Sequence, residues 1–168
     1  PIPSVGNKTT EFNRSTSTVT AAAWASGNNL NTSRRANGAL GSPVRGVVVA
    51  GCTPTIFGNI EYFTPQSKGN AVSWGEMDKR RSLYAFSNST RGITGGGQGA
   101  PSGNQINTIG FVTIATTGNE VDFGDMTTAR RDTAGASSPT RGVFCGGWEL
   151  TNIIDFVEIL TTGNAVDF

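Results

Sequence analysis

Short apolar runs, each bounded by glycine or polar residues, dominate the hydrophobic pattern of this chain. Residues 45–51 and 141–147 have this form, and residues 153–160 combine β-branched and aromatic side chains with interspersed polar ones. Short runs of this kind bounded by glycine are typical of buried strands. No segment has a convincing helical period, and the many glycine and β-branched residues disfavour helix. The pattern therefore predicts an all-β fold of many short strands.

A pattern of paired arginines shows that the chain is repetitive. The pairs Arg34-Arg35, Arg80-Arg81 and Arg130-Arg131 recur, and an Arg-Gly dipeptide begins eleven residues after the first arginine of each pair. The three segments align without a gap over 18 columns, where a column is a set of aligned positions, and each ends in a glycine-rich stretch. Self-similarity at a period of nearly 50 residues predicts one supersecondary unit per repeat.

A second repeated block closes each unit. It spans residues 60–74, 109–123 and 154–168, contains a Gly-Asn dipeptide and ends on an aromatic residue. Gly and Asn both tolerate positive φ, so the dipeptide predicts a turn. We expect the closing aromatic to pack between neighbouring units. These closing aromatics are Trp74, Phe123 and Phe168.

The two blocks divide the chain into an arm and three units. The arm covers residues 1–23, and the units cover residues 24–74, 75–123 and 124–168. Four short strands fit in each unit if the small polar segment after the arginine pair, such as 134–138, is also a strand. Four short strands in 45 to 50 residues are typical of a β-propeller blade.

The glycine doublet, the aromatic that follows it and the closing ring together resemble the Kelch repeat. The second unit has Gly96-Gly97, Phe111 and Phe123 in this order, whereas the first has Ala50-Gly51 in place of the doublet. The resemblance implies an all-β architecture of Kelch-like β-propeller blades, with three four-stranded repeats per chain.

A longer stretch is similar to repeats in large virion proteins of bacteriophages, particularly marine phages. Those repeats read like Thr-Thr-Gly-Asn-Ala-x-Asp-Phe-Gly-Asp-Leu-Thr-x-Ala-Arg and then Ser-x-Thr-Arg-Gly-Val-Phe-Gly-Gly-Gly. Their counterparts here are residues 116–130 and 138–147, and the resemblance extends over residues 24–168. It implies a structural or appendage protein of a virion that could take part in adhesion, and it implies no catalytic residues.

Composition excludes several kinds of chemistry. The 168 residues include no His and only two Cys, so neither a Ser-His-Asp triad nor a zinc site that needs His can form. A net charge of +1 gives little attraction to nucleic acid or anionic lipid, and no apolar run is long enough for a membrane span. We therefore expect a protein that is not an enzyme and that carries no metal or cofactor.

The repeated arginines have two interpretations. They could bind an anionic partner such as a surface polysaccharide. Alternatively, they could pair with Asp122, Asp167 or Glu76 between units, or cap backbone carbonyls. We favour the structural alternative, because residues fixed by a repeat usually serve the repeat itself.

The chain has two other groups of reactive side chains. Asp155, Glu158 and Asp167 could suggest the paired carboxylates of a glycosidase, but their columns hold Gly, Thr or Ser in other units. This scatter predicts solvated strand positions instead. Cys52 and Cys145 lie in different columns and are expected to be small buried thiols rather than a disulfide.

The insertions between the two blocks are the best candidates for a binding surface. They cover residues 52–59, 98–108 and 148–153, and equivalent loops of a repeat protein lie on one face. Aromatic and amide side chains of this kind would suit a sugar ring. The candidate residues are Phe57, Gln98, Asn104, Gln105, Trp148 and Glu149.

Three blades are too few to close a ring, since propellers have about four to eight. We therefore expect a homo-oligomer, and an N-terminal arm that is either disordered or adds a strand to a neighbour. The expected function is that of a non-enzymatic structural protein at the virion surface: a tail fibre, an appendage or a capsid-decorating component. Its expected partners are other virion proteins and a host-surface polysaccharide. The alternative functions are a glycan-binding lectin-like propeller and, less favoured, an enzyme on a propeller scaffold.

Overall fold

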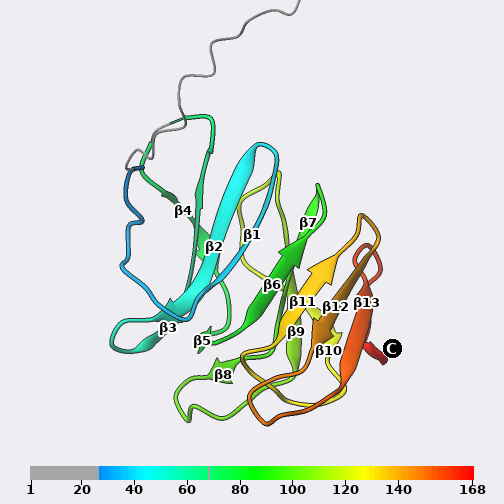
Figure 1. Ribbon diagram of the computed structural model, residues 1–168. Coiled ribbons are helices and arrows are strands. Elements are labelled where there is room, and N and C mark those ends of the chain that lie inside the picture. The colour runs from blue at the N-terminus through cyan, green and yellow to red at the C-terminus, as the bar shows by residue number, and fades with distance from the viewer. Residues whose placement is uncertain (1–26, 68) are drawn as a thin grey trace, which may run out of the picture.

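The computed structural model describes residues 27–67 and 69–168, and this part of the chain contains no helix (Figure 1). It forms 14 strands in four antiparallel sheets. The all-β class predicted from the sequence is therefore confirmed. The N-terminal arm, for which the sequence predicts disorder or an added strand, lies outside the described residues.

Three of the sheets have four strands each, in an order that follows the chain. Sheet 1 contains β1 (Gly38–Ser42), β2 (Arg45–Cys52), β3 (Ile56–Phe63) and β4 (Val72–Glu76). Sheet 2 contains β6 (Tyr84–Ser87), β7 (Arg91–Gly95), β9 (Thr108–Thr113) and β10 (Val121–Asp125). Sheet 3 contains β11 (Ala134–Ser137), β12 (Arg141–Cys145), β13 (Ile154–Glu158) and β14 (Val166–Asp167). The small polar segment of the third unit is thus a strand, β11.

The fourth sheet was not expected from the repeat. It joins β5 (Arg80–Arg81) to β8 (Gln98–Gly99) and lies in the second unit. Here the arginine pair is hydrogen-bonded to the insertion that follows β7. The corresponding contact of the first unit is a single bridge between Arg35 and Cys52.

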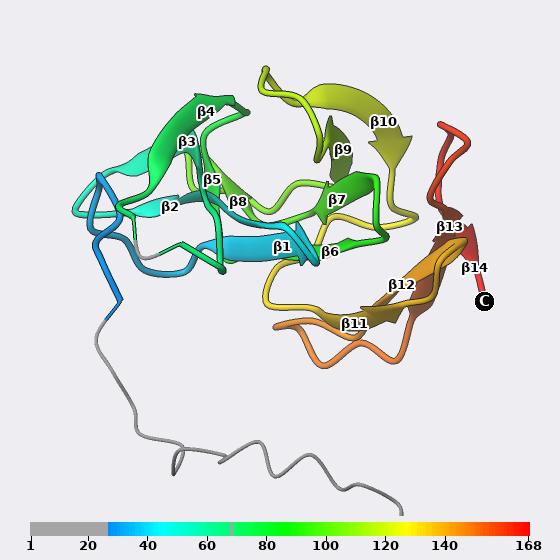
Figure 2. The same cartoon turned by 90° about the horizontal axis from the view of Figure 1, so that it is seen from above.

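The three four-stranded sheets are joined in the same way. The residue after each arginine pair has a left-handed backbone, with φ of 53° at Ala36, 55° at Ser82 and 51° at Asp132. The N–H of Ser82 donates to the carbonyl of Ala36 at 2.7 Å, and that of Asp132 donates to Ser82 at 2.9 Å. Figure 2 shows the first strands β1, β6 and β11 near one another, with β4 and β10 farther out. One geometry therefore relates each sheet to the next.

The hydrophobic core lies in the joints between sheets. Trp74 at the end of the first repeat is packed in a cluster that includes Val112 and Ile114 of sheet 2. Phe123 is packed in the same way in a cluster with Val157 and Ile159 of sheet 3. These two closing aromatics lie between units as the sequence predicted, whereas Phe168 is exposed.

Glycines allow neighbouring sheets to approach each other closely at these joints. The Arg-Gly glycine Gly92 contacts Leu40 of sheet 1, and its counterpart Gly142 contacts the ring of Phe86 in sheet 2. At both positions an added Cβ would overlap the side chain of the preceding sheet. The absence of a side chain at the repeated glycine therefore leaves a socket, that is, a space that an apolar side chain fills. This explains why the glycine recurs together with the arginine.

Candidate functional site

The first arginine of each pair is buried beside a carboxylate. Arg34 pairs with Glu61, and the Arg130 Nη2 lies 2.5 Å from Asp155 Oδ2. All four side chains are almost completely removed from solvent. A buried charge needs a partner and further hydrogen bonds, so each of these ion pairs must be satisfied within the protein.

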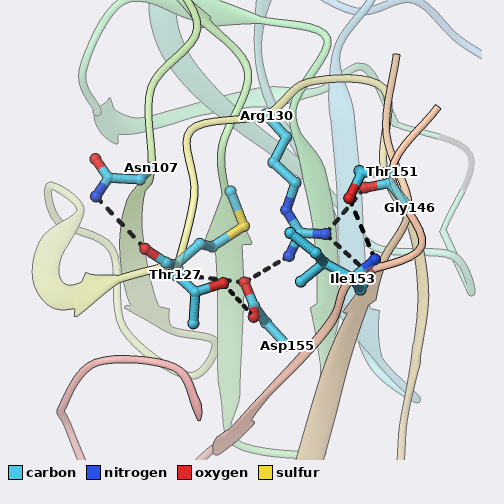
Figure 3. Close-up of polar contacts among 8 residues, drawn as sticks. Asn107, Thr127, Arg130, Gly146, Thr151, Ile153 and Asp155 are labelled. Atoms are coloured by element: carbon cyan, nitrogen blue, oxygen red, sulfur yellow. Dashed lines mark hydrogen bonds and ion pairs between the residues drawn. The ribbon is translucent and has the colours of Figure 1, made fainter. Parts of the chain in front are cut away.

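Figure 3 shows how the third unit satisfies the pair. Arg130 Nη1 donates to the carbonyls of Gly146 and Ile153, each at 3.0 Å. Asp155 accepts from the N–H of Thr127 at 3.1 Å and from its hydroxyl at 2.6 Å. Ile153 is the last residue of the variable loop 148–153, and Gly146 lies two residues before the loop begins. The guanidinium therefore holds the base of this loop closed.

The first unit uses the same arrangement. Arg34 Nη1 donates to the carbonyls of Ala50 and Asn59 at 3.0 Å, on either side of the first variable loop. Glu61 accepts a hydrogen bond from the N–H of Asn31 at 2.8 Å, in the column of Thr127. A fixed guanidinium thus supports a variable loop in both outer units.

In the middle unit, the carboxylate that pairs with the buried arginine comes from a different column. The position that holds Glu61 and Asp155 elsewhere is Gly110, and the carboxylate comes instead from Glu120, in the column of two alanines. Arg80 Nη2 lies 2.5 Å from Glu120 Oε1 and 2.8 Å from the hydroxyl of Thr94. A Cβ added to Gly110 would overlap the Glu120 carboxyl group. The two substitutions therefore compensate for each other.

This geometry corrects two predictions from the sequence. Asp155 is fully buried, so its column is not a solvated strand position, although Glu158 and Asp167 are exposed as expected. The buried arginines also pair with Glu61, Glu120 and Asp155 rather than with the three partners named from the sequence, Asp122, Asp167 and Glu76. The middle unit carries its carboxylate in another column, so the alignment of the three units does not reveal this pairing. The prediction that these arginines cap backbone carbonyls is confirmed.

The arginine of each Arg-Gly dipeptide links neighbouring sheets. Arg45 stacks over Tyr62 at 4.5 Å and donates to the carbonyl of Ile114 in the second unit at 2.7 Å. Arg91 stacks over Phe111 at 4.2 Å and donates to Ile159 of the third unit at 3.0 Å. A guanidinium combines stacking with directional donation, which suits this bridging position. These arginines are therefore engaged within the protein.

The variable loops gather at one end of the strands, at the lower edge of Figure 1. Between the first two loops lies a hollow of about 750 Å³, which Lys79 and Arg81 line together with prolines and a serine. The Arg81 Nε donates to the side chain of Gln98 at 3.1 Å. The hollow is open, contains two cationic side chains and is large enough for a sugar residue.

The predicted loop residues differ in burial and in contacts. Phe57 and Gln98 are half-buried and contact arginines, Phe57 beneath Arg34 at 5.1 Å. Gln105 donates to Glu149 at 2.6 Å and so joins the second and third loops. Asn104 is exposed, and its backbone carbonyl accepts from Gly99 at 3.0 Å.

Trp148 is the most prominent aromatic on the loop face. It is exposed, and the guanidinium of Arg131 stacks on its ring at 4.6 Å. The guanidinium of Arg131 covers one face of the indole ring, and the rest of the Trp148 side chain remains accessible. The sequence does not indicate Lys79, because this residue occupies no repeated column, and it indicates Arg81 only as a member of its arginine pair.

Neither cysteine forms a disulfide: Cys52 is buried and Cys145 is half-buried. Within residues 27–67 and 69–168, no group of three metal-ligating side chains comes together, and no helix could span a membrane. The sequence matches no protein-family model, and no curated protein is significantly similar to it.

Proposed function

We propose that this protein is a non-enzymatic structural component of a bacteriophage virion, such as a tail fibre, an appendage or a capsid-decorating protein. The observation that carries the proposal is the use of the repeated polar residues inside the scaffold. The arginines at fixed columns close loop bases or bridge sheets, and Asp155 faces Arg130 and Thr127 rather than a substrate. Repeated residues that only build the scaffold are what a structural array requires.

The arrangement of the sheets supports a propeller-like architecture. The three four-stranded sheets follow one another with the same backbone link, and their first strands lie together (Figure 2). This is how blades are placed around the axis of a propeller. We propose that each unit is one Kelch-like blade.

The resemblance of residues 116–130 and 138–147 to repeats of phage virion proteins supports a place at the virion surface. The proposed partners are therefore other virion proteins. Mass spectrometry of gradient-purified particles tests this directly, because trypsin releases residues 92–130 as one characteristic peptide. We expect this peptide in the particle fraction. Its absence from particles, together with its presence in the soluble lysate, would refute the virion assignment.

A second candidate function is attachment to an acidic host-surface glycan. The observation that favours it is the hollow beside Lys79 and Arg81, on the same face as the exposed ring of Trp148. Ammonium and guanidinium groups bind carboxylate or sulfate, and a sugar ring stacks on an indole. Such a glycan would lie across the variable loops.

If a glycan binds there, Lys79→Ala and Trp148→Ala should each weaken binding by about tenfold, which corresponds to the loss of one good contact. A glycan array with acidic oligosaccharides identifies the ligand, and calorimetry then measures the affinity. Val44→Ala is the control, because Val44 is an exposed residue of the turn at the opposite end of the strands. The absence of binding to any acidic glycan would reject this second function.

A further inference from the structure

The third sheet exposes the face that sheets 1 and 2 bury in their joints. The closing aromatic is 6% exposed at Trp74 and 3% exposed at Phe123, but 72% exposed at Phe168. Ile154 on the neighbouring strand is also exposed, whereas its counterparts in the first two sheets are fully buried. The face therefore has the apolar residues of a joint, and within residues 27–67 and 69–168 no further sheet covers them.

Arg141 shows the same incomplete joint. It stacks over Phe156 at 4.6 Å, as the two equivalent arginines stack over their own aromatic residues. Those arginines donate to a carbonyl of the next sheet, whereas Arg141 pairs with Glu158 of its own sheet at 2.7 Å. Its side chain is 48% exposed. A guanidinium already positioned by stacking is thus available to a further unit.

The first sheet exposes the complementary face. Phe63 and Pro65 are exposed, although the residues in their columns, Val112 and Ile114 in the second unit, are buried against the preceding sheet. A hollow of about 360 Å³ lies beside them, and its lining includes Leu30. Sheet 1 therefore exposes the surface that, in the internal joints, receives the closing aromatic of the preceding unit.

Among the residues that the structure describes, no closing aromatic lines this hollow. The N–H of Ala71 donates to the carbonyl of Asn29 at 3.0 Å, just as Ala165 donates to Asp125 at 2.8 Å in the joint between sheets 2 and 3. Residues 27–33 therefore lie where the end of a preceding unit would lie. In this register Gly27 occupies the column of Phe123, and it has no side chain to fill the space.

We propose that a second copy of this chain docks head to tail onto these faces. The ring of Phe168 enters the hollow beside Phe63, with Gly27 turned aside, and Arg141 donates to the carbonyl of Pro65. The carbonyl of Asp132 accepts from the N–H of Ala36. Each contact repeats one that the internal joints already make.

Two such joints join two chains into a closed ring of six units. A head-to-tail contact closes into a ring when its rotation fits, and six blades lie within the usual range for propellers. The inference rests on the proposed structural role and specifies one partner for it, the chain itself.

Sedimentation of the full 168-residue chain over about a hundredfold range of concentration tests the proposal. We expect a species of twice the 17.5 kDa chain mass. Phe168→Asp should raise the dissociation constant about tenfold or more, because it places a carboxylate in an apolar hollow. Val166→Asp is the matched control on the same strand, since Val166 and its counterparts Val72 and Val121 are all exposed. It should leave the dimer intact.

The direction of docking is tested by mixing two variants. Gly27→Trp fills the hollow from within its own chain, so this variant should be monomeric, as should Phe168→Asp. An equimolar mixture retains one intact joint and should recover dimers. Circular dichroism verifies that both variants fold.

A monomeric wild-type chain at every concentration would overturn the proposal, and so would a Phe168→Asp variant that dimerises normally. Failure of the mixture to recover dimers would overturn the head-to-tail arrangement. A monomeric chain that is nonetheless found in purified particles would refute the docking and leave the structural role standing.

Discussion

Replacing Asp155 with Asn should lower the free energy of unfolding by about 3 to 5 kcal/mol, the usual cost of removing one partner from a buried ion pair. The substitution keeps the size of the side chain and removes its charge. The guanidinium of Arg130 then remains buried, with two backbone carbonyls and no anion beside it. Urea denaturation followed by intrinsic fluorescence measures the loss.

The exposed pair of Arg141 and Glu158 provides the control for this variant. Glu158→Gln removes the same kind of charge from the same strand, β13, where both partners are about half exposed. Exposed pairs contribute about 1 kcal/mol or less, so the control should be nearly as stable as the wild type. Equal losses in the two variants would show that the burial of Asp155 has no energetic consequence.

Replacing Gly142 with Ala should destabilise the joint between sheets 2 and 3 by about 1 to 3 kcal/mol, the usual range for overpacking. The added methyl group would overlap the ring of Phe86. That ring is buried in a core where it also contacts Phe144, with the two ring centroids 5.0 Å apart. Thermal unfolding monitored by circular dichroism measures the effect.

Gly69→Ala is the matched control, because the nearest atom to its added Cβ is the Ser67 hydroxyl at 4.0 Å. This variant should unfold at nearly the same temperature as the wild type. If Gly142→Ala were equally harmless, the Arg-Gly glycine would not be the socket for the preceding sheet. A repeated glycine would then need another explanation.

The sequence was sufficient for those features that repeat in every unit. The short apolar runs predicted strands, and the recurring closing aromatics predicted the cores at Trp74 and Phe123. The fixed columns also indicated that the arginines serve the scaffold. Such features are visible because the same physical requirement recurs in each unit.

The burial of the carboxylates could not be predicted from the sequence, because the three units do not share one column. Gly110 stands in the column that holds Glu61 and Asp155 in the other units. In the middle unit the carboxylate belongs instead to Glu120, ten residues later in the chain. Only the folded structure shows that a carboxylate in either column reaches the buried guanidinium of its own unit. For this reason the sequence predicts solvated positions for these carboxylates, although Glu61 and Asp155 are core residues.

The candidate loop site was only partly predictable for a similar reason. The position of the insertions indicated the face, but the contact of Gln105 with Glu149 joins two different loops. Lys79 lies outside the insertions and enters the hollow because the second unit folds beside the first loop. Contacts between loops depend on the packing of the sheets and leave no local pattern.

The central claim is that each unit is built around one buried arginine, whose carboxylate partner comes from either of two columns. The direct test is a rescue experiment in the middle unit, with stability measured by urea denaturation. Glu120→Ala should cost about 3 to 5 kcal/mol, because it leaves Arg80 buried without its anion. Adding Gly110→Asp reproduces the combination of Asp155 and Ala165 in the third unit, and should recover most of this loss. If Gly110→Asp recovers none of the stability lost in Glu120→Ala, the two columns are not equivalent and the claim is wrong.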